Sequence, residues 1–154
     1  MKTKLTFLIG FMVFGLPALL SAQWYMGAHM KPEIIEKYGT KVFDAPKDSV
    51  YKAVKAIMIE QDFGIGIEKP EKGEIKTKRK ILSAYGDAHS AAFYYKQYVI
   101  KIEEKEPGKT TVVMTPRLFH QETDISDKAC WVIKGKAGEI KLWESLFKEI
   151  QEQL

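Results

Sequence analysis

The C-terminal segment GEIKLWESLFKEIQEQL, residues 138–154, constrains the fold more than any other part of the sequence. Its large apolar side chains recur at alternating steps of three and four residues, the spacing of one face of an amphipathic helix. They are Ile140, Trp143, Phe147, Ile150 and Leu154. Because acidic and basic residues are mixed on the polar face, we expect the helix to cover its own sheet rather than a membrane surface or a partner.

A second amphipathic helix is predicted between Pro46, which suits a first helical turn, and Gly64, which suits a helix end. Upstream of it, KPEIIEKYG at 31–39 is consistent with a short helix and TKVFDA at 40–45 with a short strand. The apolar face of the second helix contains Val50, Val54, Ile57 and Met58, with Tyr51 beside them.

The sequence between the two amphipathic helices alternates between apolar and polar residues, as strands do. PEKG at 70–73 and EPGK at 106–109 have the composition of hairpin turns, which makes neighbouring strands antiparallel. Residues 121–137 fit either a strand around Trp131 or a loop packed by that side chain. The strand-like segments are 64–69, 74–82, 91–105 and 110–122.

The predicted fold class is therefore α+β, with an antiparallel sheet of about four to six strands and two main helices packed on one face. The element order is β-α-β-β-β-β-α, which is helix-grip-like. We assign residues 1–22 to a signal peptide, 23–40 to an N-terminal segment with a short helix, and 41–154 to a single domain.

The first 22 residues have the three regions of a secretory signal peptide. Lys2 and Lys4 precede an uncharged apolar run, and small residues follow it up to Ala22, after which we expect cleavage. An uncleaved anchor is the alternative, but the apolar run is shorter than the ~20 residues that a spanning helix needs. LSAQ at 20–23 resembles a lipoprotein processing box in which Gln23 replaces the lipidated cysteine. We therefore expect a periplasmic or secreted bacterial protein that is not a lipoprotein.

Charge gives little support for a nucleic-acid partner. The chain has 24 Lys and Arg against 20 Asp and Glu, and two of the basic residues lie in the leader, so the mature chain carries only two excess positive charges. Nucleic-acid-binding domains usually combine a pI above about 9 with a clustered basic face. Export, as expected from the leader, also argues against a nucleic-acid partner.

The basic run GEIKTKRK, residues 73–80, is the strongest local cluster of charge. On an unbroken strand Lys76, Lys78 and Lys80 share one face, where they are candidates for contact with an anionic surface. Arg79 then shares the other face with isoleucines, either with its guanidinium in water or with an acidic partner. The alternative is that the three lysines only keep the strand solvated and free from edge-to-edge pairing.

The sequence contains no pattern typical of a catalytic, cofactor or metal site. Its three histidines are far apart and lack metal-ligand spacing with each other or with Cys130, which we expect to be a small buried apolar residue. Asp87, His89 and Ser90 lie in one short segment, GDAHS, whose composition is typical of a turn. We expect no enzyme activity, cofactor or metal. The histidines are His29, His89 and His120.

Two stretches carry a resemblance to known families. VFDAPKDSVYKAVKAIMIEQDFGIGIEKPEKGEIKTKRK and the closing LWESLFKEIQEQL resemble the small helix-grip domains of bacterial envelope proteins, including those similar to the BamC component of outer-membrane protein assembly. BamC-like proteins are lipid-anchored, a feature that this chain lacks. The helix start also resembles that of START-type lipid-binding domains. The residues that match the helix-grip domains are Ala45, Pro46, Val50 and Ala53, then Gly64, Gly73, Ile75 and Thr77.

The BamC-like resemblance implies an exported, non-catalytic domain that binds an envelope protein or surface and contributes to outer-membrane or cell-envelope organisation. The START-like resemblance implies the alternative, a cavity between sheet and helices that binds a lipid or another hydrophobic small molecule.

Overall fold

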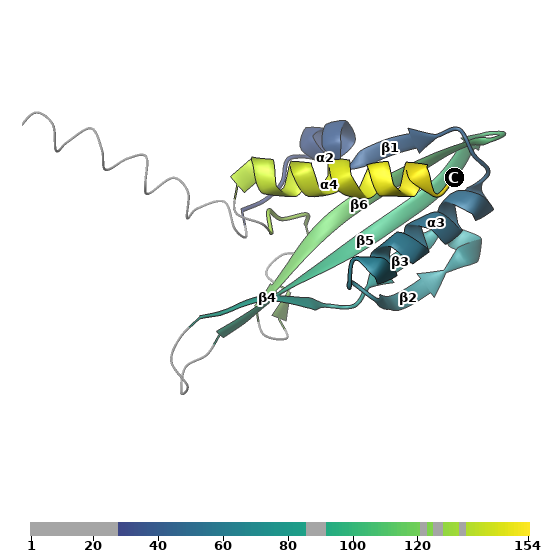
Figure 1. Cartoon of the computed structure of the whole chain (residues 1–154). Coiled ribbons are helices and arrows are strands. Elements are labelled where there is room, and N and C mark those ends of the chain that lie inside the picture. The colour runs from purple at the N-terminus through teal and green to yellow at the C-terminus, as the bar shows by residue number, and fades with distance from the viewer. Residues whose placement is uncertain (1–27, 86–91, 121–122, 125–127, 133–134) are drawn as a thin grey trace, which may run out of the picture.

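The computed structural model describes residues 28–85, 92–120, 123–124, 128–132 and 135–154. One antiparallel sheet lies under three helices, which confirms the predicted α+β class (Figure 1). The helices are α2 (Pro32–Tyr38), α3 (Lys47–Glu60) and α4 (Gly135–Glu152), with a short 3-10 helix at Pro70–Lys72. The strands are β1 (Thr40–Phe43), β2 (Ile65–Lys69), β3 (Glu74–Thr77), β4 (Lys80–Tyr85), β5 (Ala92–Glu106), β6 (Lys109–His120) and β7 (Thr123–Asp124).

The long hairpin of β5 and β6 forms the centre of the sheet, whose strand order is β1-β6-β5-β3-β2. Strands β3 and β4 both pair with β5, one after the other along its length, and β7 pairs with β6. The sheet has seven strands rather than four to six, because residues 80–85 form a strand separate from β3 and residues 123–124 add a short one.

Helices α3 and α4 lie across the same face of the sheet (Figure 1). Their apolar sides meet the inward side chains of β3, β5 and β6, as the helical and strand periodicities predict. Buried side chains of the two layers pack against one another. The largest fully buried ones include Phe43, Ile57, Met58, Tyr98, Met114 and Trp143.

Residues 128–132 form no named strand, although Cys130 makes an isolated antiparallel bridge with His29. Trp131 is 4% exposed and belongs to the main core cluster, which agrees with the alternative in which this tryptophan packs a loop. Residues 133–134 lie outside the described residues. Cys130 is fully buried with Leu118 and Val132, which confirms the prediction of a small buried side chain. The predicted signal peptide and the GDAHS segment lie outside the described residues.

Candidate functional site

The basic segment is divided by a break in the strand at residues 78–79, between the end of β3 and the start of β4. Lys76 lies opposite Val99 of β5, whereas Lys80 lies opposite Lys96. Val99 and Lys96 are three positions apart on one strand, so they point to opposite faces of the sheet. The prediction that Lys80 shares a face with Lys76 and Lys78 is therefore wrong.

Lys80 points toward the helices and binds the C-terminal end of α3. Its ammonium donates a hydrogen bond to the Gln61 carbonyl oxygen at 3.0 Å and lies 3.6 Å from an Asp62 carboxylate oxygen. It also lies 5.0 Å from the centre of the Phe63 ring. These contacts join β4 to α3 and remove Lys80 from the candidate anion-binding set.

Arg79 lies on the face of the sheet that is turned away from the helices. Its guanidinium stacks on the Phe119 ring at 3.9 Å, and Phe119 pairs in register with Tyr95, which in turn lies opposite Ile81. Arg79 and Ile81 thus share a face as predicted, but Ile75 and Thr77, which were expected beside them, point inward and are buried. The cation–π contact was not foreseen, because the sequence alone does not place Phe119 next to residue 79.

The face turned away from the helices, which we call the open face, has no helix over it in the part of the chain that the structure describes (Figure 1). Strand pairing places three half-exposed aliphatic side chains on it: Val42 on β1, Ile67 on β2 and Ile81 on β4. They are 52%, 52% and 57% exposed. Val42 and Ile67 lie on the two opposite edge strands of the sheet. The open face thus exposes aliphatic side chains on three of its strands.

Three exposed lysines lie on or beside this face. Lys76 is in register with Ile67 and Val99, and Lys101, two residues farther along β5, is in register with Glu74. Lys78 lies at the strand break, where its side chain lies beside Gly64. None of the three has a carboxylate within 4.0 Å among the described residues, whereas Lys69 on the same face pairs with Glu74. The open face thus combines lysines that form no ion pair within 4.0 Å in the described residues with exposed apolar side chains, and Glu74 is the acidic residue opposite Lys101.

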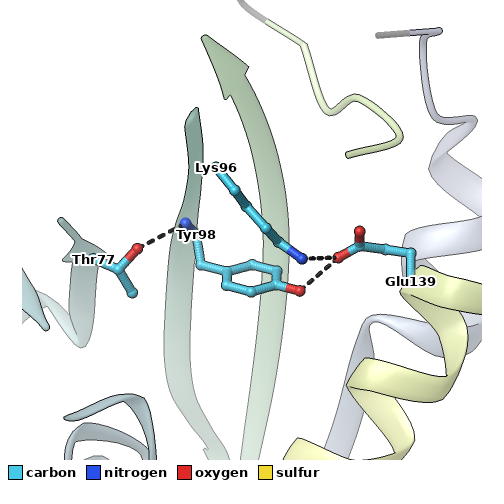
Figure 2. A network of polar contacts seen from close by, with 4 residues as sticks. All are labelled: Thr77, Lys96, Tyr98 and Glu139. Carbon is cyan, nitrogen blue, oxygen red and sulfur yellow. Dashed lines mark hydrogen bonds and ion pairs between the residues drawn. The ribbon is translucent and has the colours of Figure 1, made fainter. Parts of the chain in front are cut away.

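A polar network lies inside the core on the opposite side of the sheet (Figure 2). Lys96 on β5 donates to Glu139 Oε1 on α4 at 2.8 Å, and the Tyr98 hydroxyl donates to the same oxygen at 2.5 Å. The hydroxyl of Thr77 accepts the Tyr98 backbone N–H at 2.9 Å. The network joins β3, β5 and the first part of α4 through charge-assisted hydrogen bonds.

Burial changes the acid–base properties of this network. It lowers the pKa of Lys96 from the ordinary value of 10.5, although Glu139 opposes the shift. Burial also raises the pKa of Tyr98 well above 10.0, and the charge and hydrogen bond of Glu139 act in the same direction. Lys96 is 1% exposed and Glu139 0%, so this network joins helix and sheet from within the core.

Lys96 and Glu139 were missed by the sequence reasoning, although a signal for them exists. Lys96 occupies the inward parity of β5, two positions before Tyr98, and Glu139 precedes Trp143 by one helical turn on the apolar side of α4. A lysine and a glutamate in the apolar registers of two packed elements indicate a buried ion pair.

Several surface grooves of the described residues open to solvent. One, of about 580 Å³, lies between α2, β1 and α4 and is lined by both lysines and glutamates. A second, about 560 Å³, lies beside α2, and a third, about 380 Å³, lies between α3 and the C-terminus. None of the three is lined by the lysines or the half-exposed aliphatic side chains of the open face.

The histidines within the described ranges have structural surroundings. His29 forms a backbone bridge with Cys130, and the His120 ring lies 5.0 Å from the ring of Tyr94. No group of three His, Cys, Asp or Glu side chains with metal-binding geometry occurs in the described residues. His89 lies outside them. No described helix combines the length and the apolar character that membrane crossing requires.

Comparisons with known proteins leave the family open. No protein-family model matches the chain, and no curated protein matches its sequence. Among solved structures, the chain is similar to the crystal structure of a DUF4468 family protein from Bacteroides ovatus ATCC 8483. The two are 18% identical, the match covers 74% of this chain and 83% of that chain, and the TM-score is 0.39. A likeness of this size carries no argument about family or function.

Proposed function

We propose that this protein is an exported, non-catalytic domain of the bacterial cell envelope, and that it acts by binding an anionic envelope component through the open face of its sheet. One observation carries the proposal: half-exposed aliphatic side chains and lysines that form no ion pair within 4.0 Å in the described residues share a face that no described helix covers. Cations and exposed aliphatic side chains on one face are the combination that binding at an anionic interface uses.

Export is supported by the first 22 residues. Their two lysines, apolar run and small residues up to Ala22 match a secretory leader, and Gln23 occupies the position at which a lipoprotein has its cysteine. The compartment limits the anions that a basic face meets, because nucleic acid is absent there while acidic proteins and anionic lipids are present.

A binding role is supported over a catalytic one by the location of the shifted groups. Catalytic acids and bases combine a shifted pKa with access to substrate. Lys96 and Tyr98, whose pKa values are shifted by burial, bond to Glu139 within the core and are 1% and 0% exposed. Their arrangement fits the attachment of α4 to the sheet.

Photo-cross-linking in intact cells of the host tests the proposal. A photoreactive side chain is placed at Ile67 or Ile81 on the open face, and in matched controls at Lys52 or Lys141, which are exposed on α3 and α4. We expect the open-face positions to give a reproducible protein or lipid adduct in the envelope fraction and the helix positions to give little. Equal labelling at all four positions, or an adduct only at the helix positions, would refute the proposed surface.

A further inference from the structure

The open face offers cations and apolar side chains in alternating positions. Lys76 lies in one row across the strands, between Ile67 on β2 and Val99 on β5. Lys101 lies in the next row on the same face, opposite Glu74, and Lys78 follows at the strand break with its backbone N–H donating to the Gly64 carbonyl oxygen. A partner must therefore offer anionic groups and an apolar layer close to one another.

We infer that the open face binds an anionic lipid surface, with Lys76, Lys78 and Lys101 at the headgroups and Ile67 and Ile81 at the boundary with the acyl chains. The inference rests on the proposed function and names the component that the face binds. Lysines near an anionic membrane are attracted to its surface potential, and aliphatic side chains add affinity when they enter the interface.

Charge argues against a second copy of the chain as the occupant. Arg117 pairs with Asp124 and Lys69 with Glu74, so these four groups largely cancel. Apart from the residues near the β5–β6 turn, the remaining charges of the open face are mainly positive. Two open faces in contact would bring these like charges together, which disfavours association. They are Lys76, Lys78 and Lys101, against Glu103.

The distribution of the side chains favours lipid over an acidic protein. Stable protein interfaces concentrate their binding energy in recessed pockets that receive large anchors. The lysines and isoleucines named above are spread over β2, β3, β4 and β5 and line none of the three grooves described above. Lipid headgroups move laterally and can adjust to such a spread, whereas the acidic groups of a folded protein are fixed.

Vesicle binding tests the inference directly, with the protein purified from its host. The vesicles contain phosphatidylcholine alone or with phosphatidylglycerol, and binding is measured by co-sedimentation at low and high salt. One lysine near an anionic surface contributes roughly fivefold to the partition coefficient, so Lys76→Gln, Lys78→Gln and Lys101→Gln together should lower it about a hundredfold. Binding should also weaken with salt and be absent from neutral vesicles.

A matched variant controls for total charge. Lys37→Gln, Lys52→Gln and Lys141→Gln remove the same number of charges from exposed positions on α2, α3 and α4. We expect this variant to bind vesicles within about threefold of the wild type, a residual effect of net charge alone. An equal loss in both variants would overturn the inference, because binding would then depend on the net charge of the protein and not on the open face.

A reporter substitution keeps the test independent of the lysine variants. Ile81→Trp places an indole at a position that is 57% exposed. Its emission should shift to shorter wavelength with phosphatidylglycerol vesicles, while Ile59→Trp on α3, 53% exposed in the wild type, should not respond. No shift and no vesicle binding, together with a protein adduct at the open face in cells, would overturn the lipid inference and leave the proposed function standing. No adduct and no vesicle binding would overturn both.

Discussion

The ammonium of Lys96 and the carboxylate of Glu139 lie 2.8 Å apart in the core, and their bond joins the centre of the sheet to helix α4. Glu139 also accepts the Tyr98 hydroxyl, so one carboxylate oxygen holds two buried donors (Figure 2). Its other oxygen, Oε2, has no hydrogen-bond partner among the described residues. Desolvation offsets much of the attraction in such a pair, so its main consequence is the large cost of removing one member alone.

Removal of Glu139 alone should destabilise the protein strongly. Glu139→Leu leaves the Lys96 ammonium and the Tyr98 hydroxyl buried without their acceptor, and loss of one partner of a buried pair costs about 3–5 kcal/mol. Urea unfolding followed by circular dichroism measures the change. Lys55→Met is the matched control, because Lys55 and Glu68 are 2.7 Å apart but each 39% exposed, so its cost should stay below about 1 kcal/mol.

Replacement of the whole network should be milder than the single change. Lys96→Met, Tyr98→Phe and Glu139→Leu together exchange three polar groups for apolar ones of similar volume, which leaves no buried group unsatisfied. The triple variant should therefore unfold at higher urea than Glu139→Leu. If the costs of the single changes simply added, the network would not be coupled as the geometry indicates.

The alternation of side chains was predicted correctly where a strand is continuous and wrongly where it breaks. On β5 the inward positions of Tyr98, Ile100 and Ile102 follow directly from the sequence. At residues 78–79 the sequence keeps alternating while the backbone leaves the strand, so the face of Lys80 is reversed. At the break the Lys78 N–H bonds to the Gly64 carbonyl oxygen and the Lys80 ammonium to the Gln61 carbonyl oxygen, contacts that no local pattern reveals.

The buried network was missed for a related reason. A lysine in a strand is normally exposed, and only a partner 43 residues away makes burial of Lys96 tolerable. Helix and strand periodicity predict which elements form and which sides face inward. They place Lys96 and Glu139 on inward sides, but they do not show that these two side chains meet, because that contact is set by how α4 lies on the sheet.

Alkaline pH should reveal the ionisation of Tyr98. Because the folded pKa of Tyr98 is raised above the unfolded value of 10.0, its contribution to stability is fully present below pH 10 and is lost as pH rises toward the folded pKa. The loss approaches about 1.4 kcal/mol per pH unit once the unfolded tyrosine has ionised. Lys96, with a lowered pKa, acts in the opposite direction up to its unfolded value of 10.5, and it is present in both proteins compared.

The comparison is between wild type and Tyr98→Phe, each unfolded in urea between pH 9 and pH 11. Wild type should lose stability more steeply above pH 10, because phenylalanine has no proton to release. Parallel curves would show that Tyr98 keeps its ordinary pKa in the folded state. Both proteins retain Tyr51, whose pKa is also raised by burial, so its effect cancels in the difference.

Processing of the leader can be checked by intact-mass measurement of the protein from the host envelope. We expect a mature chain that begins at Gln23, because Ala22 provides the small residue before the cut and no cysteine follows it for lipidation. Ala22→Asp should block cleavage and leave the precursor mass. A mature protein with a lipid adduct, or unprocessed wild type in the cytoplasm, would contradict export as proposed.

Gly73 and Gly108 share a left-handed backbone conformation but differ in their surroundings, which makes them a matched pair. Their φ angles are +63° and +76°, so alanine at either position pays a conformational cost of about 1–2 kcal/mol. An added Cβ at Gly73 would lie 2.0 Å from the Ile102 carbonyl oxygen, whereas at Gly108 it would meet nothing within 4 Å.

Gly73→Ala should therefore lower the free energy of unfolding well beyond Gly108→Ala, because the turn must move away from β5 and lose the bond from the Ile102 N–H to the Gly73 carbonyl. Thermal unfolding measures both, and equal costs would mean that the β2–β3 turn does not pack on β5 as closely as these distances indicate.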